Sequence, residues 1–127
     1  FIGSTTPFTT TLTGHIDVTV NWTLATNDVD VALTRGACTA QQFIDDQCTI
    51  ATFSESVTDK PEHIRLASAA PATYTIILAN AGPGDESLSW QAVHTPTVAS
   101  GSAGTDSEKG SALPVKMRGY HGGVTLR

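Results

Sequence analysis

Apolar and polar residues alternate along much of the chain, most clearly over residues 15–24. A period of two kept over five consecutive apolar positions predicts a β-strand with one buried face. Residues 29–34 and 62–67 repeat this pattern over shorter lengths, and residues 8–13 and 48–53 are predicted as further strands. The apolar positions of the first strand are Ile16, Val18, Val20, Trp22 and Leu24.

Residues 72–93 contain two more alternating runs, separated by a turn rich in Gly, Pro and Asp at residues 81–87. In the first run Ile77 is apolar on the face opposite Tyr74 and Ile76, which predicts a central strand covered on both sides. The second run, residues 88–93, is predicted to return beside the first as a hairpin.

About seven short strands at spacings of 8–15 residues, joined by turns, are typical of an antiparallel β-sandwich. Helical periodicity is confined to residues 39–46, where Thr39 and Gln42 have the spacing of a capping box. The tail offers two more candidate strands, at residues 112–118 and 124–126, around a turn at 119–123. The predicted fold is therefore all-β, an antiparallel sandwich of about seven to nine strands with one short helix.

The length of 127 residues fits one ordinary domain with a two-layer core. We expect an extended lead-in at residues 1–7, the sandwich at 8–95, and a linker-like segment with a tail at 96–127, where Gly, Ser, Ala and Thr dominate at first. No apolar run is long enough to span a bilayer. The start at Phe1, without a charged and apolar leader, fits a processed chain or one cut at a chosen boundary.

Charge is divided unevenly between the body and the tail. Residues 1–96 carry a net charge of −7 and residues 97–127 a net charge of +2, for a total of −5. The total is too acidic for a nucleic-acid binder that works by neutralising phosphates. A basic tail on an acidic body is expected to fold back on it or to dock on a neighbouring copy.

Cys38 and Cys48 are the only cysteines and bracket a short segment. In a secreted module such a pair is expected to form a disulfide, which stabilises by roughly 2–3 kcal/mol through a loop of this length. A metal site is the alternative, but no C-x-x-C or histidine spacing supplies its other ligands.

Catalytic motifs are absent from the sequence. The histidines are scattered, and neither H-E-x-x-H nor G-x-S-x-G occurs. We therefore predict that the chain is not an enzyme, although a triad assembled only in space leaves no sequence signal. Asn21 begins an N-x-T sequon on the predicted outer face, a candidate glycosylation site. Trp22 and Trp90 alternate with polar neighbours, which favours core packing over a sugar-binding platform.

Several of these segments together resemble the bacterial pre-peptidase C-terminal (PPC) domain. The resemblance covers about residues 8–95 and implies a secreted, jelly-roll-like sandwich attached to extracellular proteases or other hydrolases. Some members bind calcium, and some bind collagen-like or other polymers. This chain departs from the family because no catalytic domain accompanies it and a basic tail follows it. The segments that carry the resemblance are Trp22, Asp28-Val29-Asp30-Val31, Lys60-Pro61-Glu62, Ala72-Thr73-Tyr74-Thr75 and Gly82-Pro83-Gly84-Asp85-Glu86-Ser87.

The resemblance implies one possible cofactor, calcium. Because calcium prefers clustered oxygen donors, its candidate ligands are Asp28, Asp30 and Asp85. Calcium-binding members draw on an acidic run before the first strand, whereas residues 1–7 contain no acid. In the alternative interpretation Asp28 caps a turn and the other carboxylates keep a sheet edge soluble.

Two functions follow as hypotheses. In the first, the chain is a secreted structural subunit of a filament or adhesive layer, binding copies of itself through a terminal strand that covers a neighbour's open edge. In the second, it is an accessory domain that holds a secreted hydrolase on a protein or polysaccharide polymer. The tail residues expected to take part in assembly are Val115, Met117, Arg118, Val124 and Leu126.

Overall fold

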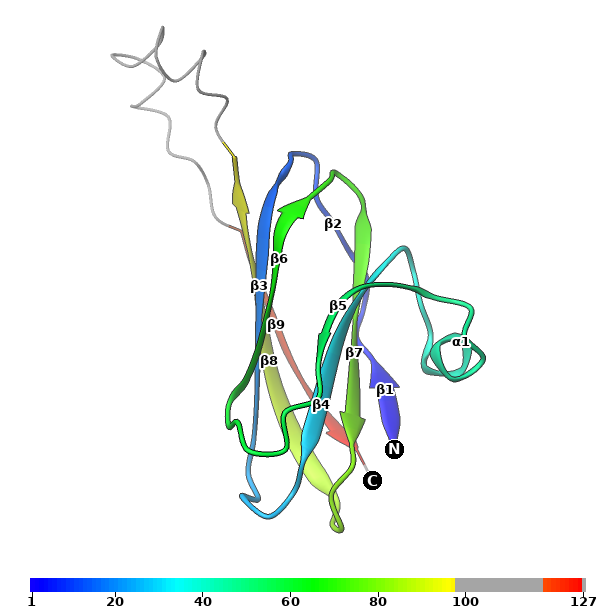
Figure 1. The fold of residues 1–127 in the computed structure, drawn as a ribbon, viewed down its shortest axis with the longest axis vertical. Coiled ribbons are helices and arrows are strands. Elements are labelled where there is room, and N and C mark those ends of the chain that lie inside the picture. Colours follow the sequence, from blue (N-terminus) through cyan, green and yellow to red (C-terminus); the bar gives the residue numbers. More distant parts are fainter. Residues whose placement is uncertain (98–117, 127) are drawn as a thin grey trace, which may run out of the picture.

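Two antiparallel sheets pack face to face in the computed structural model, which describes residues 1–97 and 118–126 (Figure 1). Sheet A has the strand order β1-β7-β4-β5, with β2 also paired to β7, and sheet B has the order β6-β3-β8-β9. The strands of sheet A are β1 (Ile2–Ser4), β2 (Phe8–Thr9), β4 (Val29–Arg35), β5 (Thr49–Ser54) and β7 (Thr73–Asn80). Those of sheet B are β3 (Gly14–Trp22), β6 (Glu62–Ala69), β8 (Glu86–Pro96) and β9 (Arg118–Leu126). The described residues also contain one short helix, α1 (Ala40–Ile44), and the predicted all-β sandwich is confirmed.

The core lies between the sheets and is built by the alternation read from the sequence. Inward positions on β3, β4 and β7 are almost fully buried, because a strand directs every second side chain to the same face. Leu24 is an exception: β3 ends at Trp22, and Leu24 is 48% exposed. The main inward residues are Ile16, Val18, Val20, Trp22, Val29, Val31, Leu33, Tyr74, Ile76 and Leu78.

The predicted hairpin of residues 72–93 is wrong. β7 lies in sheet A between β4 and the N-terminal strands, whereas β8 lies in sheet B between β3 and β9. The turn between β7 and β8 therefore crosses from one sheet to the other. The prediction that β7 is a central strand covered on both faces is correct, since Ile77 on its outer face is only 2% exposed.

The first residues of the chain are not only a lead-in. β1 and β2 lie on the same edge of β7, and between them the Thr5 N–H donates to the Ile76 carbonyl at 2.9 Å. The Thr5 hydroxyl in turn accepts from the Ile76 N–H at 3.2 Å. The predicted strand at residues 8–13 is reduced to β2, so this edge of sheet A is an interrupted strand.

Within the described residues the tail forms one strand, β9, which runs straight through the predicted turn at residues 119–123 and includes the predicted strand at 124–126. The candidate strand at residues 112–118 lies outside the described residues except for Arg118. It pairs with β8 from Arg118 opposite His94 to Leu126 opposite Glu86. Glycine allows this pairing at Trp90, because a Cβ atom on Gly122 would lie 2.7 Å from the indole Nε1 atom. Leu126 is 6% exposed, so the end of the tail belongs to the core.

A buried carboxylate joins the turns at one end of the sandwich. Glu86 is 1% exposed and accepts hydrogen bonds from the Thr23 N–H and hydroxyl, the Leu24 N–H and the Asn27 side-chain amide. Burial alone raises the pKa of this carboxyl, but these hydrogen bonds to its charged form outweigh burial and lower the pKa from 4.5 to about 2. The group therefore stays ionised in the folded protein.

Asn27 continues this network into the turn between β7 and β8. Its Oδ1 accepts from the Gly84 N–H at 3.1 Å, and its Nδ2 donates to the Gly84 carbonyl at 3.1 Å. The Trp22 indole N–H donates to the Asn27 carbonyl at 3.0 Å. Gly82 is required here because a Cβ atom would come within 2.5 Å of the Asn27 Cα atom. The turn from β3 to β4 is thereby fixed to the turn from β7 to β8.

We predict that Glu86→Gln lowers the free energy of unfolding by about 1–3 kcal/mol at pH 7, since an amide offers one acceptor where the carboxylate offered two. Folding lowers the pKa of Glu86, so the native state binds fewer protons and this contribution is complete above pH 4.5 and lost as the pH falls towards 2. Urea unfolding followed by tryptophan fluorescence from pH 2 to 7 should show the variant approaching the parent at low pH. Asp85→Asn, at an exposed neighbouring position, is the control. Equal stability of Glu86→Gln and the parent at pH 7 would contradict the assignment.

Candidate docking surface

The outer face of sheet A is partly covered by α1 and the loops that flank it. Thr39 caps the helix, its hydroxyl accepting from the Gln42 N–H at 3.1 Å while the Gln42 side chain accepts from the Thr39 N–H at 2.9 Å. The predicted capping box is confirmed. Beneath this segment a small apolar cluster forms on the sheet, made of Ala32, Cys38 and Ile77 with Ile2, Phe43 and Cys48 packed against it.

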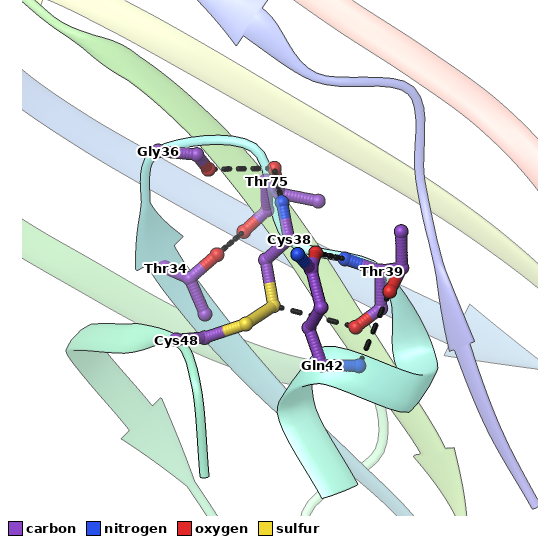
Figure 2. The surroundings of a disulfide bond; sticks show 7 residues. All are labelled: Thr34, Gly36, Cys38, Thr39, Gln42, Cys48 and Thr75. Atoms are coloured by element: carbon purple, nitrogen blue, oxygen red, sulfur yellow. Dashed lines mark hydrogen bonds between the residues drawn. A yellow bond between two sulfur atoms is a disulfide. The ribbon is translucent and has the colours of Figure 1, made fainter. Parts of the chain in front are cut away.

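The predicted disulfide between Cys38 and Cys48 is present, with Cα atoms 5.9 Å apart. Figure 2 shows how it is held against the sheet by Thr75. The Thr75 hydroxyl accepts from the Cys38 N–H at 3.2 Å and donates to the Gly36 carbonyl at 2.9 Å, and the Thr34 hydroxyl donates to the Thr75 carbonyl at 3.2 Å. The disulfide and these bonds fix the α1 segment over sheet A.

A pocket of about 300 Å³ lies on the same face, between α1 and β5. Most of its lining is apolar, and two carboxylates, Asp30 and Glu55, also line it. The apolar lining residues are Ile2, Val31, Ala32, Phe43, Ile50, Phe53, Ile77 and Ala79, of which Val31 has its side chain in the core between the sheets.

A β-bulge places two of these apolar side chains together. Ile50 is opposite Thr34 and Phe53 is opposite Ala32, so the register between β4 and β5 skips Ala51. Ile50 and Phe53 are three residues apart, so in a regular strand without this bulge they would point to opposite faces of the sheet. They instead share the outer face, where they are 50% and 58% exposed.

Asp30 has an unusual electrostatic environment for a side chain at the surface. Burial, followed by the negative charges of Asp28, Glu55 and Glu62, raises the pKa of Asp30 from 3.8 to about 6. Among the described residues every ion pair involves Asp17, so neither Asp30 nor Glu55 forms one. Acidic groups with raised pKa values beside a pocket are typical of binding sites.

The predicted calcium ligands are not gathered into one site. Asp30 lies on β4 at the pocket and Asp28 just before that strand, whereas Asp85 lies in the turn from β7 to β8. No group of three or more His, Cys, Asp or Glu side chains within residues 1–97 and 118–126 has an arrangement that holds a metal ion. Calcium binding therefore stays a prediction that the geometry of these residues does not strengthen.

The predicted tail residues divide into three groups. Val115 and Met117 lie outside the described residues. Arg118 and Val124 belong to β9, and Leu126 is buried at its end. Asn21 is exposed as predicted, with its Oδ1 accepting from the Trp22 N–H at 2.9 Å, and glycosylation there stays a prediction.

A second polar cluster lies on the outer face of sheet B. Asp17 contacts the His15 and His63 Nε2 atoms at 3.5 and 3.4 Å and the Arg65 Nε atom at 3.8 Å. These side chains are partly exposed, and surface ion pairs of this kind contribute little to stability. That the chain is not an enzyme stays a prediction.

Sequence reasoning missed the pocket. It predicted residues 48–53 as a strand but did not foresee the bulge at Ala51, which has no signature in the local pattern. The available signal was the absence of charge from Thr49–Ser54 together with three large apolar residues nearby, Phe43, Ile50 and Phe53.

Comparison with known protein families finds no matching family, and comparison with curated proteins finds no match either. The segment Gly82–Ser87 is one of those that carry the resemblance to the PPC domain. In the structure its Gly84 backbone forms two hydrogen bonds with the Asn27 side chain, and its Glu86 belongs to the network between the turns. Within the described parts of the chain, no helix is long and apolar enough to cross a bilayer.

We predict that Asp30→Asn stabilises the protein at neutral pH. Folding raises the pKa of Asp30, so the native state binds more protons and this group costs stability as the pH rises through about 4 to 6. The gain at pH 7 should be about 0.5–1 kcal/mol, less than a direct conversion of the shift, because solvent screens the partly exposed carboxylate. Urea midpoints measured at pH 4 and pH 7 should diverge from the parent only at pH 7. Asp59→Asn, an exposed carboxylate, is the control, and a gain of equal size there would contradict the prediction.

We also predict that replacing both cysteines by serine lowers the free energy of unfolding by about 2–3 kcal/mol, because the short loop between them is no longer closed in the unfolded chain. Reduction of the parent protein with dithiothreitol should give a similar loss in urea unfolding. An unchanged midpoint in both experiments would show that the link stabilises neither the loop nor the sheet.

Proposed function

We propose that this chain is a non-catalytic β-sandwich subunit of an extracellular or cell-surface assembly, and that it joins neighbouring copies by addition of a terminal strand. The observation that carries the proposal is the way in which β9 completes sheet B. The strand arrives after a connection of 21 residues, whereas two residues suffice to join antiparallel neighbours. A β9 strand from another copy has the same residues to offer to β8.

The fit between β9 and its site supports this proposal. Leu126 enters the core beside Gly3, where a Cβ atom would lie 2.6 Å from the Leu126 Cδ2 atom. Gly122 is matched to Trp90, and the pairing continues over the whole strand. Without β9, β8 would present an open edge, which sandwich proteins rarely leave uncovered.

In the single chain β9 pairs with its own β8. Because β9 belongs to the same chain as β8, its effective concentration at that edge is high, on the order of millimolar for linked partners, so a dilute subunit is expected to stay closed. Exchange between copies would then require the crowding of an assembly. This order of events would keep the subunit monomeric until it reaches its neighbours.

The pocket on sheet A favours a second function, that of an accessory domain which binds a polymeric substrate for a secreted hydrolase. The PPC resemblance supports the same role. Neither proposal requires a catalytic residue or calcium.

We predict that cysteines at positions 89 and 123 will trap the β8–β9 pair, because Ser89 faces Gly123 and both positions are exposed. In dilute solution the Ser89→Cys/Gly123→Cys chain should give an internal disulfide and run as a monomer on a non-reducing gel. Above roughly 1 mM the proposal expects a ladder of covalent oligomers. Separately prepared Ser89→Cys and Gly123→Cys chains should give a mixed dimer when combined at that concentration.

Ser89→Cys paired with Thr58→Cys, at an exposed position outside this register, is the matched control and should not cross-link. Internal disulfides alone at every concentration, with no mixed dimer, would overturn strand exchange. This design is sharper than deletion of the tail, since deletion would also remove Leu126 from the core.

A further inference from the structure

The outer groove is the name we give to the pocket on sheet A together with the edge of β5 beside it. We propose that the outer groove binds an extended polypeptide segment that places a lysine or arginine at Asp30 and Glu55 and flanks it with apolar side chains. This inference does not rest on exchange of β9, because the outer groove and β9 lie on different sheets.

The apolar part of the outer groove is exposed to water, which is unfavourable for large apolar side chains. Ile50 and Phe53, which line the pocket, are at least half exposed. Large apolar side chains gathered on one face beside a cavity are typical of a binding surface, because covering them removes apolar area from water. The disulfide and the Thr75 hydrogen bonds hold the α1 wall in place before a ligand arrives.

The edge of β5 points to a polypeptide as the ligand. β5 ends sheet A, and its residues Thr49–Ser54 contain no charge and no proline. Such an edge offers unpaired backbone N–H and C=O groups to an incoming strand. By contrast, β6 at the edge of sheet B carries Glu62, His63 and Arg65.

The two carboxylates define the charge of that ligand. Asp30 and Glu55 line the pocket, and Asp28 adds negative charge near Asp30. The lysine and arginine side chains of residues 1–97 lie elsewhere: Lys60 is over the Trp22 ring at 5.5 Å, Arg65 contacts Asp17, and Arg35 lies near Tyr74. The Phe1 ammonium donates to the Asn80 carbonyl at 3.1 Å and forms no ion pair with Asp30 or Glu55. A lysine or arginine from a partner would supply the missing opposite charge, whereas an acidic segment would be repelled.

A peptide tests this directly. The sequence Ala-Leu-Pro-Val-Lys-Met-Arg, which the chain itself contains at residues 112–118, has the required chemistry. As a fluorescein-labelled heptapeptide with blocked ends it should bind the full-length protein in a fluorescence anisotropy titration. The same peptide with K116E and R118E should bind at least tenfold more weakly. A third peptide with the same side chains but N-methylated at alternate residues should also lose at least tenfold, since it cannot pair with β5.

Variants of the protein locate the site. Asp30→Asn/Glu55→Gln should weaken binding of the basic peptide about tenfold and reduce its preference over the acidic peptide, and Phe53→Ser should weaken all binding. Asp59→Asn is the charge control and should change neither. Amide chemical shifts in a nuclear magnetic resonance titration should move at β5 and α1 and remain unchanged on β6.

The titration is repeated on the Ser89→Cys/Gly123→Cys protein with its internal disulfide closed. Unchanged binding there would separate the outer groove from β9 exchange. The proposal is overturned if the basic peptide does not bind up to millimolar concentration, if the basic and acidic peptides bind equally, or if Asp30→Asn/Glu55→Gln and Phe53→Ser leave binding unchanged. Equal binding of the N-methylated peptide would overturn pairing with β5.

Discussion

The buried carboxylate of Glu86 is the interaction on which the arrangement of the two sheets depends. It accepts the N–H groups of Thr23 and Leu24 and the side chain of Asn27, which hold the turn between β3 in sheet B and β4 in sheet A. Glu86 itself begins β8, the strand that pairs with both β3 and β9. Removing the charge would leave several buried donors unpaired at the place where the chain passes between the sheets.

Asp30 shows the opposite use of the same chemical group. Hydrogen-bond donors surround Glu86 and lower its pKa, whereas Asp30 has other carboxylates around it and a raised pKa. The difference follows from environment, since donors favour the charged form and burial near like charges disfavours it. A carboxylate of the first kind stabilises a fold. One of the second kind costs stability, and it is retained more readily where a partner later supplies the opposite charge.

Much of this fold could be predicted from the sequence, because alternation decides which side chains face the core. It identified the inward residues of β3 and β4, the double burial of β7 at Ile77, and the cysteine pair. Alternation does not say which strand is the neighbour, so the run at residues 72–80 was paired with the next one along the chain instead of with β4. The outer groove was missed for a related reason. The bulge at Ala51 brings Ile50 and Phe53 to the same face of the sheet, and this bulge can be recognised only from the pairing of β5 with β4.

The edges of the two sheets are protected to different degrees, and this difference bears on where partners bind. The edge formed by β1 and β2 is interrupted between Ser4 and Phe8, and β6 carries charged side chains. β9 covers β8 and contains Gly119, Gly122 and Gly123, which weaken any further strand pairing on its free side. β5 has a bulge at Ala51 but no interruption, charged side chain or glycine, and it stands next to the pocket and its two carboxylates. Since an uncharged edge strand would otherwise invite aggregation, its retention beside a preformed pocket is best explained by a partner strand that covers it.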